Sequence, residues 1–265
     1  MGGLSLELRC ALDPATFARV KLAFEPDPWQ ADLLASTSKR SLLNCCRQSG
    51  KSTSAAILAL HTAHYRPGAL VLLGSPSLRQ SRELFAKVTN FRKRLDPDLK
   101  LEEDNKTSFE LKNGSRVVCL PGTAETIRGF SAPDLIIEDE AAFVDDAFNW
   151  AVRPTLAVSN GRLILMSTPN GQRGHFHEAW SKGGDEWERV EVPARDCPRI
   201  TSEFLEKERR ALGEWHYRQE YDCAFVDSVH QLFRSADIER AITDDVKPLF
   251  LPTGELKPLF GDEAA

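Results

Sequence analysis

Long hydrophobic runs are missing from this chain of 265 residues. No apolar stretch approaches the roughly 20 residues that a helix needs to cross a bilayer. The segment from Met1 to Asp13 has no apolar core behind a basic start, so it does not resemble a signal peptide. We therefore expect a cytoplasmic protein without membrane contact.

Paired cysteine motifs are also missing. The six cysteines, at positions 10, 45, 46, 119, 197 and 223, include no C-x-x-C pair and no neighbouring histidine at zinc-binding spacing. Disulfides are rare in a reducing cytosol. We therefore expect six reduced thiols and no zinc site.

An excess of positive charge is the third absence. The net charge is −5 and the pI is near 5.8, which argues against a protein that binds nucleic acid over its whole surface. One stretch differs: residues 76–100 hold seven Lys or Arg and three acids, a local net charge of +4. This stretch is either a solvated helix face or a contact for DNA, with Lys87, Arg92, Lys93 and Arg94 as candidates.

The most informative stretch is Arg47-Gln48-Ser49-Gly50-Lys51-Ser52-Thr53. It follows an apolar strand pattern at 41–46 and precedes a helical pattern at 55–60, which is the context of a phosphate-binding P-loop. Backbone N–H groups of such a turn and the helix N-terminus together attract phosphate oxygens. We expect Lys51 to reach the β- and γ-phosphates of ATP and the Ser52 hydroxyl to bind Mg²⁺. The expected nucleotide-binding residues of the loop are Gln48, Ser49, Gly50, Lys51, Ser52 and Thr53.

The second motif is acidic and follows an apolar strand pattern at 135–137. Glu138, Asp139 and Glu140 come directly after it, and Asp139-Glu140 matches the end of a Walker B motif. Parallel sheets bind ligands at the carboxyl ends of their strands, so Asp139 is the expected Mg²⁺ ligand. Glu140 is the expected residue to orient and activate the attacking water. The alternative is a strand that ends in solvated acids.

Three other sites belong to the same hypothesis. Trp29 and Gln30 open a helix upstream of the P-loop, and a glutamine amide matches the donor and acceptor edge of adenine. Arg128 precedes a glycine in a loop, which predicts an exposed guanidinium. Ser167 and Thr168 end an apolar strand, where hydroxyls can sense a γ-phosphate; a simple turn is the alternative.

The remaining patterns predict an α/β protein with a mostly parallel sheet. We expect strands at 69–74, 162–166 and 187–192, a long helix at 77–95 and shorter helices at 14–20, 28–34, 202–211 and 214–221. Asn113-Gly114 predicts a hairpin between 108–112 and 115–120 with a type I′ turn. A closing strand is expected at 223–226, followed by a loose tail.

Taken together, these motifs resemble the ATPase domain of the terminase large subunit of tailed bacteriophages, over about residues 28–230. Ser167-Thr168-Pro169-Asn170-Gly171 is similar to the coupling motif of that family, and a non-glycine at Cys45 is similar to its variant Walker A loop. The resemblance implies a P-loop NTPase of the additional-strand, catalytic-glutamate type. It also implies ATP hydrolysis that drives double-stranded viral DNA into a procapsid.

The resemblance carries further expectations about partners and roles. It implies a homo-oligomeric ring, a portal protein, a small terminase subunit and action in the host cell cytoplasm. Arg47 would touch the γ-phosphate within its own subunit, and Arg128 would act on the neighbouring subunit. Expected domains are an ATPase core at 1–185, a lid at 186–230, and at 231–265 a tail or the start of a linker to a missing nuclease domain.

Two alternatives and one departure from the family pattern remain. Only 35 residues follow His230, too few for the nuclease domain of large terminases, so we expect no DNA cleavage. A superfamily 2 helicase shares similar motifs but needs a second RecA-like domain, and 94 residues after Gly171 are too few. A nucleotide-binding scaffold without hydrolysis would not need Glu140.

Overall fold

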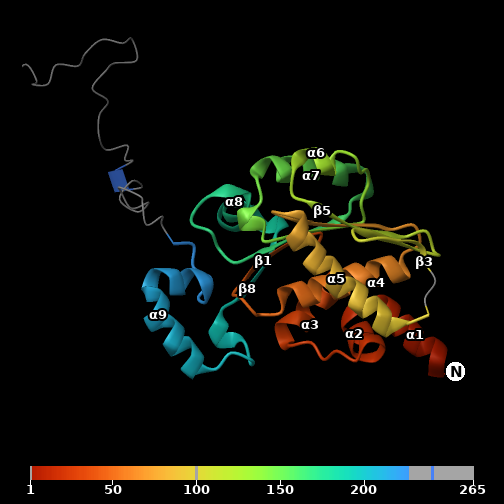
Figure 1. Cartoon of the computed structure of the whole chain (residues 1–265), viewed down its shortest axis with the longest axis horizontal. Helices are drawn as coiled ribbons and strands as arrows, with labels where there is room; N and C mark the ends of the chain where they lie inside the picture. Colours follow the sequence, from red (N-terminus) through yellow and green to blue (C-terminus); the bar gives the residue numbers. More distant parts are fainter. Residues whose placement is uncertain (1, 99–100, 227–239, 242–265) are drawn as a thin grey trace, which may run out of the picture. The chain divides into compact units, whose positions relative to one another are not determined.

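An eight-stranded sheet forms the centre of the computed structural model, which describes residues 2–98, 101–226 and 240–241 (Figure 1). From edge to edge the strands are β3 (Leu101–Asp104), β4 (Ser108–Leu111), β5 (Arg116–Pro121), β2 (Leu70–Ser75), β6 (Leu135–Asp139), β7 (Arg162–Ser167), β1 (Arg40–Cys45) and β8 (Glu188–Val192). The strands from β5 to β8 pair in parallel, and β3 and β4 extend the sheet as antiparallel strands.

Helices cover both faces of this sheet. One layer contains α1 (Gly2–Leu12), α2 (Pro14–Leu22), α3 (Pro28–Ala35), α4 (Lys51–Tyr65) and α5 (Leu78–Leu95), and the other contains α6 (Ala124–Ile127), α7 (Asp146–Ser159) and α8 (Gly174–Lys182) (Figure 1). Alternate residues of a strand face opposite layers. Thus Ile137 packs with the first layer, and Ile136 packs with the second.

Burial on both faces explains why the central strands are so apolar. Every residue of β2 and β6 is buried, as is all of β1 and β7 except the first residue of each. Parallel sheets between two helical layers show this pattern because neither face meets water. The strands predicted at 69–74 and 162–166 are therefore confirmed, with small shifts of their ends.

The strand order decides the type of P-loop fold. β7 lies between β1, which leads into the P-loop, and β6, which leads into Asp139 and Glu140. This is the additional strand expected of the catalytic-glutamate type, so the predicted fold class is confirmed. Because these strands are parallel, the P-loop, the acidic pair and Ser167 all lie at the same edge of the sheet.

The predicted hairpin forms, but its turn differs from the prediction. Gly114 has a positive φ of 78°, whereas Asn113 does not adopt positive φ, so the turn is not type I′. The Asn113 side chain explains the difference because its amide donates to the carbonyls of Ala63 and His64 while its oxygen accepts the Ser115 N–H. These contacts with α4 hold the turn residue in another conformation.

The C-terminal part of the described chain contains one confirmed and one wrong prediction. The two helices predicted at 202–211 and 214–221 appear as α9 (Ser202–Glu220), whose two halves meet at Gly213 with φ 75° and ψ 161°. The strand predicted at 223–226 is absent from the described chain. Cys223 has a left-handed φ of 56°, and its carbonyl accepts the Asn44 amide instead of a ladder partner.

Several features of the described residues bear on the other expectations. All six cysteines are free and buried. Within the described part of the chain, no helix combines the length and the apolarity required for a membrane span. The described residues up to Val226 form one compact unit. The predicted boundary between core and lid falls inside that unit and stays a prediction, and most of the predicted tail lies outside the described residues.

The turn before β7 gives a test of this packing. A Cβ atom at Gly161 would lie 2.1 Å from the Pro133 carbonyl oxygen and 3.0 Å from that of Asp134. We expect Gly161→Ala to lower the free energy of unfolding by about 2–3 kcal/mol because backbone atoms must move. Urea denaturation followed by circular dichroism measures this change.

The control is Gly129→Ala, whose Cβ would meet its nearest atom at 3.9 Å, an ordinary contact. This variant should stay within about 0.5 kcal/mol of the wild type. Equal stabilities of the two variants would contradict the packing described for the turn.

Candidate functional site

A cleft of about 620 Å³ lies at the carboxyl edge of the sheet. Residues 47–53 line it together with Glu140, and side chains from three other regions complete the wall. The sequence motifs from β1 and from β6 therefore meet in one cavity. Asp139, Ser167 and Thr168 are buried at the ends of the neighbouring strands.

The loop between β1 and α4 has the backbone of a phosphate cradle. Gln48 and Gly50 have left-handed φ angles of 62° and 100°, and α4 begins at Lys51. Alternation of left- and right-handed residues turns successive N–H groups into a concave surface that suits an anion. Cys45, where the general motif has glycine, is fully buried in the core at the end of β1.

Lys51 and Glu140 form an ion pair across the cleft. The Lys51 Nζ atom lies 3.1 Å from Glu140 Oε1, and Lys51 is only 7% exposed. Burial by itself lowers the pKa of Lys51, but the charges of Glu140 and Asp139 outweigh it and raise that pKa above its usual value. The lysine therefore remains a cation, as a phosphate ligand must.

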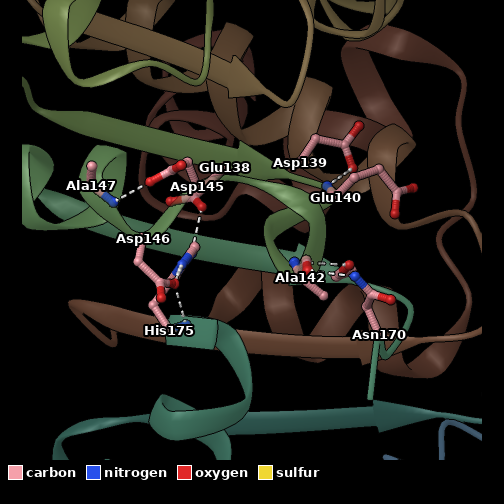
Figure 2. A network of polar contacts seen from close by, with 10 residues as sticks. Glu138, Asp139, Glu140, Ala142, Asp145, Asp146, Ala147, Asn170 and His175 are labelled. Atoms are coloured by element: carbon pink, nitrogen blue, oxygen red, sulfur yellow. Dashed lines mark hydrogen bonds and ion pairs between the residues drawn. The ribbon is translucent and has the colours of Figure 1, made fainter. Parts of the chain in front are cut away.

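Asp139 lies behind this pair and is 8% exposed. Burial, and then the nearby charge of Glu140, raise the pKa of Asp139 to about 6. The Glu140 N–H donates to Asp139 Oδ1 over 3.1 Å (Figure 2). Asp139 is thus a carboxylate in a setting that favours a nearby cation.

Glu140 has an unusual backbone conformation. Its φ of 54° and ψ of 43° are left-handed, which costs a non-glycine residue free energy. The short helix η1 (Ala141–Phe143) follows directly. The Ser167 hydroxyl accepts the Ala142 N–H at 3.2 Å, and the Asn170 amide donates to the Ala142 carbonyl at 3.1 Å (Figure 2). Residues of the predicted coupling motif therefore hold the segment that follows Glu140.

The structure places Gln30 beside the P-loop with its amide already engaged. Gln30 is 1% exposed; its oxygen accepts the Asp27 N–H at 2.9 Å, and its nitrogen donates to the Gly50 carbonyl at 3.3 Å. A side chain at Gly50 would collide with that nitrogen at 2.5 Å. Trp29 does not line the cleft and packs half-buried against the core. The predicted adenine contact stays a prediction for both residues.

Arg199 is a cleft residue that the sequence patterns did not indicate. It lies after β8, donates two hydrogen bonds to Asp27 at 2.9 and 2.6 Å and a third to the Ser49 carbonyl at 2.9 Å. Arg199 and Ser49 are 150 positions apart in the chain. A single arginine in a loop carries no motif, so only the fold reveals this contact.

Arg47 also has a partner from a distant segment. Its Nε atom donates to Glu220 Oε2 at 2.5 Å, and its backbone N–H donates to the Glu220 carbonyl at 3.4 Å. Glu220 ends α9, in the region predicted as a lid. The predicted cis contact between Arg47 and a γ-phosphate therefore requires the guanidinium to leave Glu220.

Arg128 lies outside the cleft. It is exposed, as predicted, and borders a separate groove of about 670 Å³ together with Trp150 and Val158. These two apolar side chains are 69% and 88% exposed. Nothing in this arrangement brings Arg128 to the phosphate loop of its own chain.

The basic helix α5 divides into residues with different surroundings. Arg92 is 5% exposed, lies over the Phe109 ring at 5.8 Å and faces Asp104 at 3.9 Å. It is therefore a poor candidate for contact with DNA. Lys87 is exposed and lines the cleft. Lys93 and Arg94 remain exposed on the helix surface.

Comparison with known proteins identifies the family. Residues 42–240, more than half of the chain, match the family described as "Terminase large subunit, T4likevirus-type, N-terminal". The terminase large subunit of Escherichia phage T5 is 31% identical over 191 residues, which cover 69% of this chain and 42% of that protein. The chain spans about half the length of the curated relatives it matches.

Solved structures share the fold at low sequence identity. The large terminase ATPase domain of Thermus phage P74-26 superposes with a TM-score of 0.72 at 24% identity, covering 81% of this chain and all of that one. The large terminase of another thermophilic bacteriophage, solved in complex with ADP, gives a TM-score of 0.59 at 11% identity, covering 83% of this chain and 53% of that one.

These matches bear on the predicted helicase alternative. They agree with the sequence motifs in favouring a terminase over a helicase. The scaffold that binds nucleotide without hydrolysis stays an alternative prediction. The chain belongs to the T4likevirus-type terminase large subunit family, and residues 42–240 correspond to the N-terminal part of that subunit.

Proposed function

We propose that this chain hydrolyses ATP to drive double-stranded viral DNA into a procapsid. The observation that carries the proposal is the Lys51–Glu140 pair, 3.1 Å apart, between a P-loop and the end of the strand next but one. A phosphate-binding cation and a carboxylate able to activate water are the two groups that hydrolysis of a γ-phosphate requires. A large terminase that shares the fold was solved with ADP.

The residues of the cleft have distinct roles in this proposal. Residues 48–53 hold the phosphates, and Lys51 neutralises charge on the β- and γ-phosphates. When ATP binds, Lys51 would pair with the γ-phosphate instead of with Glu140. The freed Glu140 carboxylate orients a water molecule in line with the γ-phosphate and accepts its proton.

Mg²⁺ suits the oxygen atoms near the phosphate loop. Ser52 and Asp139 offer a hydroxyl and a carboxylate, and Mg²⁺ commonly uses one or two protein oxygens with phosphate oxygens and waters completing its shell. Because Asp139 is buried with a raised pKa, its charge gains from an adjacent cation. A metal ion held by Ser52 and Asp139 would supply positive charge beside the phosphates during hydrolysis.

Two arginines are proposed to act on the transferred phosphoryl group. Arg47 would exchange Glu220 for the γ-phosphate in its own subunit, which would connect phosphate binding to α9. Arg128 would supply charge to the cleft of a neighbouring subunit in a ring. Support for this assignment is its exposure and its place in a groove whose lining includes no residue of the phosphate loop.

Ser167 and Thr168 are proposed to couple hydrolysis to movement. Both are buried at the end of β7, between the strands that carry the P-loop and Glu140. The lid at 186–230 would respond and move DNA held elsewhere. Lys87, Lys93 and Arg94, which are all exposed, are the remaining candidates on α5 for DNA contact.

The proposal includes partners and boundaries that follow from family membership. These are a portal protein, a small terminase subunit, a homo-oligomeric ring and action in the host cell cytoplasm. The tail or linker at 231–265 and the lack of DNA cleavage stay predictions. Incubation of the chain with supercoiled plasmid and Mg²⁺ tests the last of these directly.

Substitution of the catalytic carboxylate tests the proposed reaction. Glu140→Gln keeps the size of the side chain but cannot accept a proton. We expect the turnover of ATP to fall about 10²- to 10⁴-fold, while the dissociation constant of a fluorescent ATP analogue stays close to that of the wild type. A chelator in place of Mg²⁺ tests the metal requirement in the same assay.

The matched control is Glu83→Gln, an exposed glutamate on α5 outside the cleft. It should hydrolyse ATP at the wild-type rate. Normal turnover by Glu140→Gln would exclude the role proposed for this carboxylate.

Arg199 gives a second test because it holds the phosphate loop from outside the motif. Arg199→Ala removes three hydrogen bonds to Asp27 and Ser49. Since the side chain is 53% exposed, we expect ATP affinity to weaken only about threefold to tenfold. Arg195→Ala, a neighbouring exposed arginine that does not line the cleft, should leave that affinity unchanged. Unchanged affinity in both variants would contradict the proposed support.

The trans role of Arg128 predicts complementation between two inactive variants. Arg128→Ala should retain ATP affinity but lose the rise of specific activity with protein concentration, since an arginine finger contributes roughly 10³- to 10⁵-fold in rate. Mixing it with Glu140→Gln should restore turnover, because one subunit supplies Glu140 and its neighbour supplies Arg128. If mixed rings form and remain inactive, Arg128 does not act in trans.

A further inference from the structure

Glu138 is a buried acid whose role the sequence motifs leave unassigned. It precedes Asp139 in β6, and strand alternation turns it away from the P-loop, toward the layer of α7 and α8. It is fully buried, and its Oε1 atom lies 2.6 Å from Nε2 of His175 (Figure 2). Its other oxygen has no hydrogen-bond partner among the residues that the structure describes. His175 is therefore the contact that balances this carboxylate.

His175 lies between two carboxylates at the start of α8. Its Nδ1 atom is 2.9 Å from Asp146 Oδ1, and the same oxygen accepts the backbone N–H of His175 at 2.7 Å (Figure 2). Burial alone lowers the pKa of the imidazole, but Glu138 and Asp146 outweigh burial and raise that pKa. Because each ring nitrogen lies within hydrogen-bond distance of a carboxylate oxygen, His175 connects β6 to the first turn of α7.

The same stretch of chain holds the other side of Glu140. Ser167 and Asn170 bind the backbone of Ala142, while His175 binds the side chain of Glu138. The segment 167–175 therefore forms hydrogen bonds with Glu138, two positions before Glu140, and with Ala142, two positions after it. A non-glycine residue with a φ of 54° persists where its surroundings determine its conformation.

We infer that His175 is a positioning residue which, through Glu138, fixes the end of β6 so that Glu140 points into the cleft. The inference rests on the proposed hydrolysis of ATP. A purely structural role is the competing explanation. However, a buried ion pair contributes little net stability because desolvation offsets the attraction, and an apolar pair of similar volume commonly serves folding as well or better.

This difference leads to a direct experiment on the full chain. Glu138→Leu/His175→Leu removes both charges and leaves no buried ion unpaired, so the melting temperature should not fall. The leucine pair no longer ties β6 to α7 by directed contacts. We expect the single-turnover rate of ATP hydrolysis to fall roughly threefold to thirtyfold, while the dissociation constant for ATP remains unchanged.

A conservative variant separates the effect of the hydrogen bond to His175 from the effect of the charge on Glu138. Glu138→Gln keeps an oxygen that can accept the His175 N–H, so the end of β6 stays tied. It should retain most of the wild-type single-turnover rate. A leucine pair that folds, binds ATP and turns over at the wild-type rate overturns the inference.

Two adjacent acids give a matched pair if the leucine variant does not fold. Asp146→Ala removes the contact to His175, whereas Asp145→Ala removes only the helix-capping bond to the Ala147 N–H at 2.8 Å (Figure 2). The inference expects a slower single turnover in Asp146→Ala alone, at unchanged ATP affinity. Equal rates for the two variants would contradict it. Absence of turnover in the wild-type chain would instead count against the proposed function.

Discussion

The contact between Lys51 and Glu140 depends on the order of the strands, and the rest of the site depends on that contact. The two residues follow β1 and β6, which are separated by one strand, a distance of about 10 Å between their backbones. Long side chains from both ends then meet at 3.1 Å over the carboxyl end of β7. Direct pairing of β1 with β6 would leave less room for a phosphate chain, and two intervening strands would separate the charges. The additional strand thus sets the width of the cleft.

Left-handed backbone occurs at three positions around this cleft. Gln48, Gly50 and Glu140 have left-handed φ angles, and other segments contact Gly50, Ser49 and the chain on both sides of Glu140. The side chain of Gln30 packs against Gly50, Arg199 binds the Ser49 carbonyl, and residues 167–175 bind on both sides of Glu140. Such strain persists because a well-packed sheet and two helical layers over-determine the loops. The supports come from segments that are distant in sequence, including α8, α9 and the loop after β7.

Particular residues show why some expectations succeeded and others did not. The P-loop, the acidic pair and the central strands could be predicted from local patterns. An apolar run indicates a buried strand, and turn residues indicate a loop. Asn113 does not adopt the positive φ that the predicted type I′ turn requires, because its side chain donates to carbonyls at the end of α4. Arg92 belongs by charge to the basic stretch, yet the fold buries it beside Phe109. In both cases a contact between distant segments outweighed the local preference.

The sequence by itself determined the fold class, the phosphate-loop segment, the acidic pair after β6 and the family, because these follow from contiguous motifs and from the alternation of apolar strands with helices. Only the tertiary structure decided which distant side chains share the cleft. It brought Arg199 within hydrogen-bond distance of the P-loop, Glu220 of Arg47 and His175 of Glu138. It also put Arg128 at a separate groove. The physical reason is that a lone charged residue in a loop or at a helix end has no periodic pattern. Its partner is chosen by how the elements pack, and that information is absent from any local stretch of the chain.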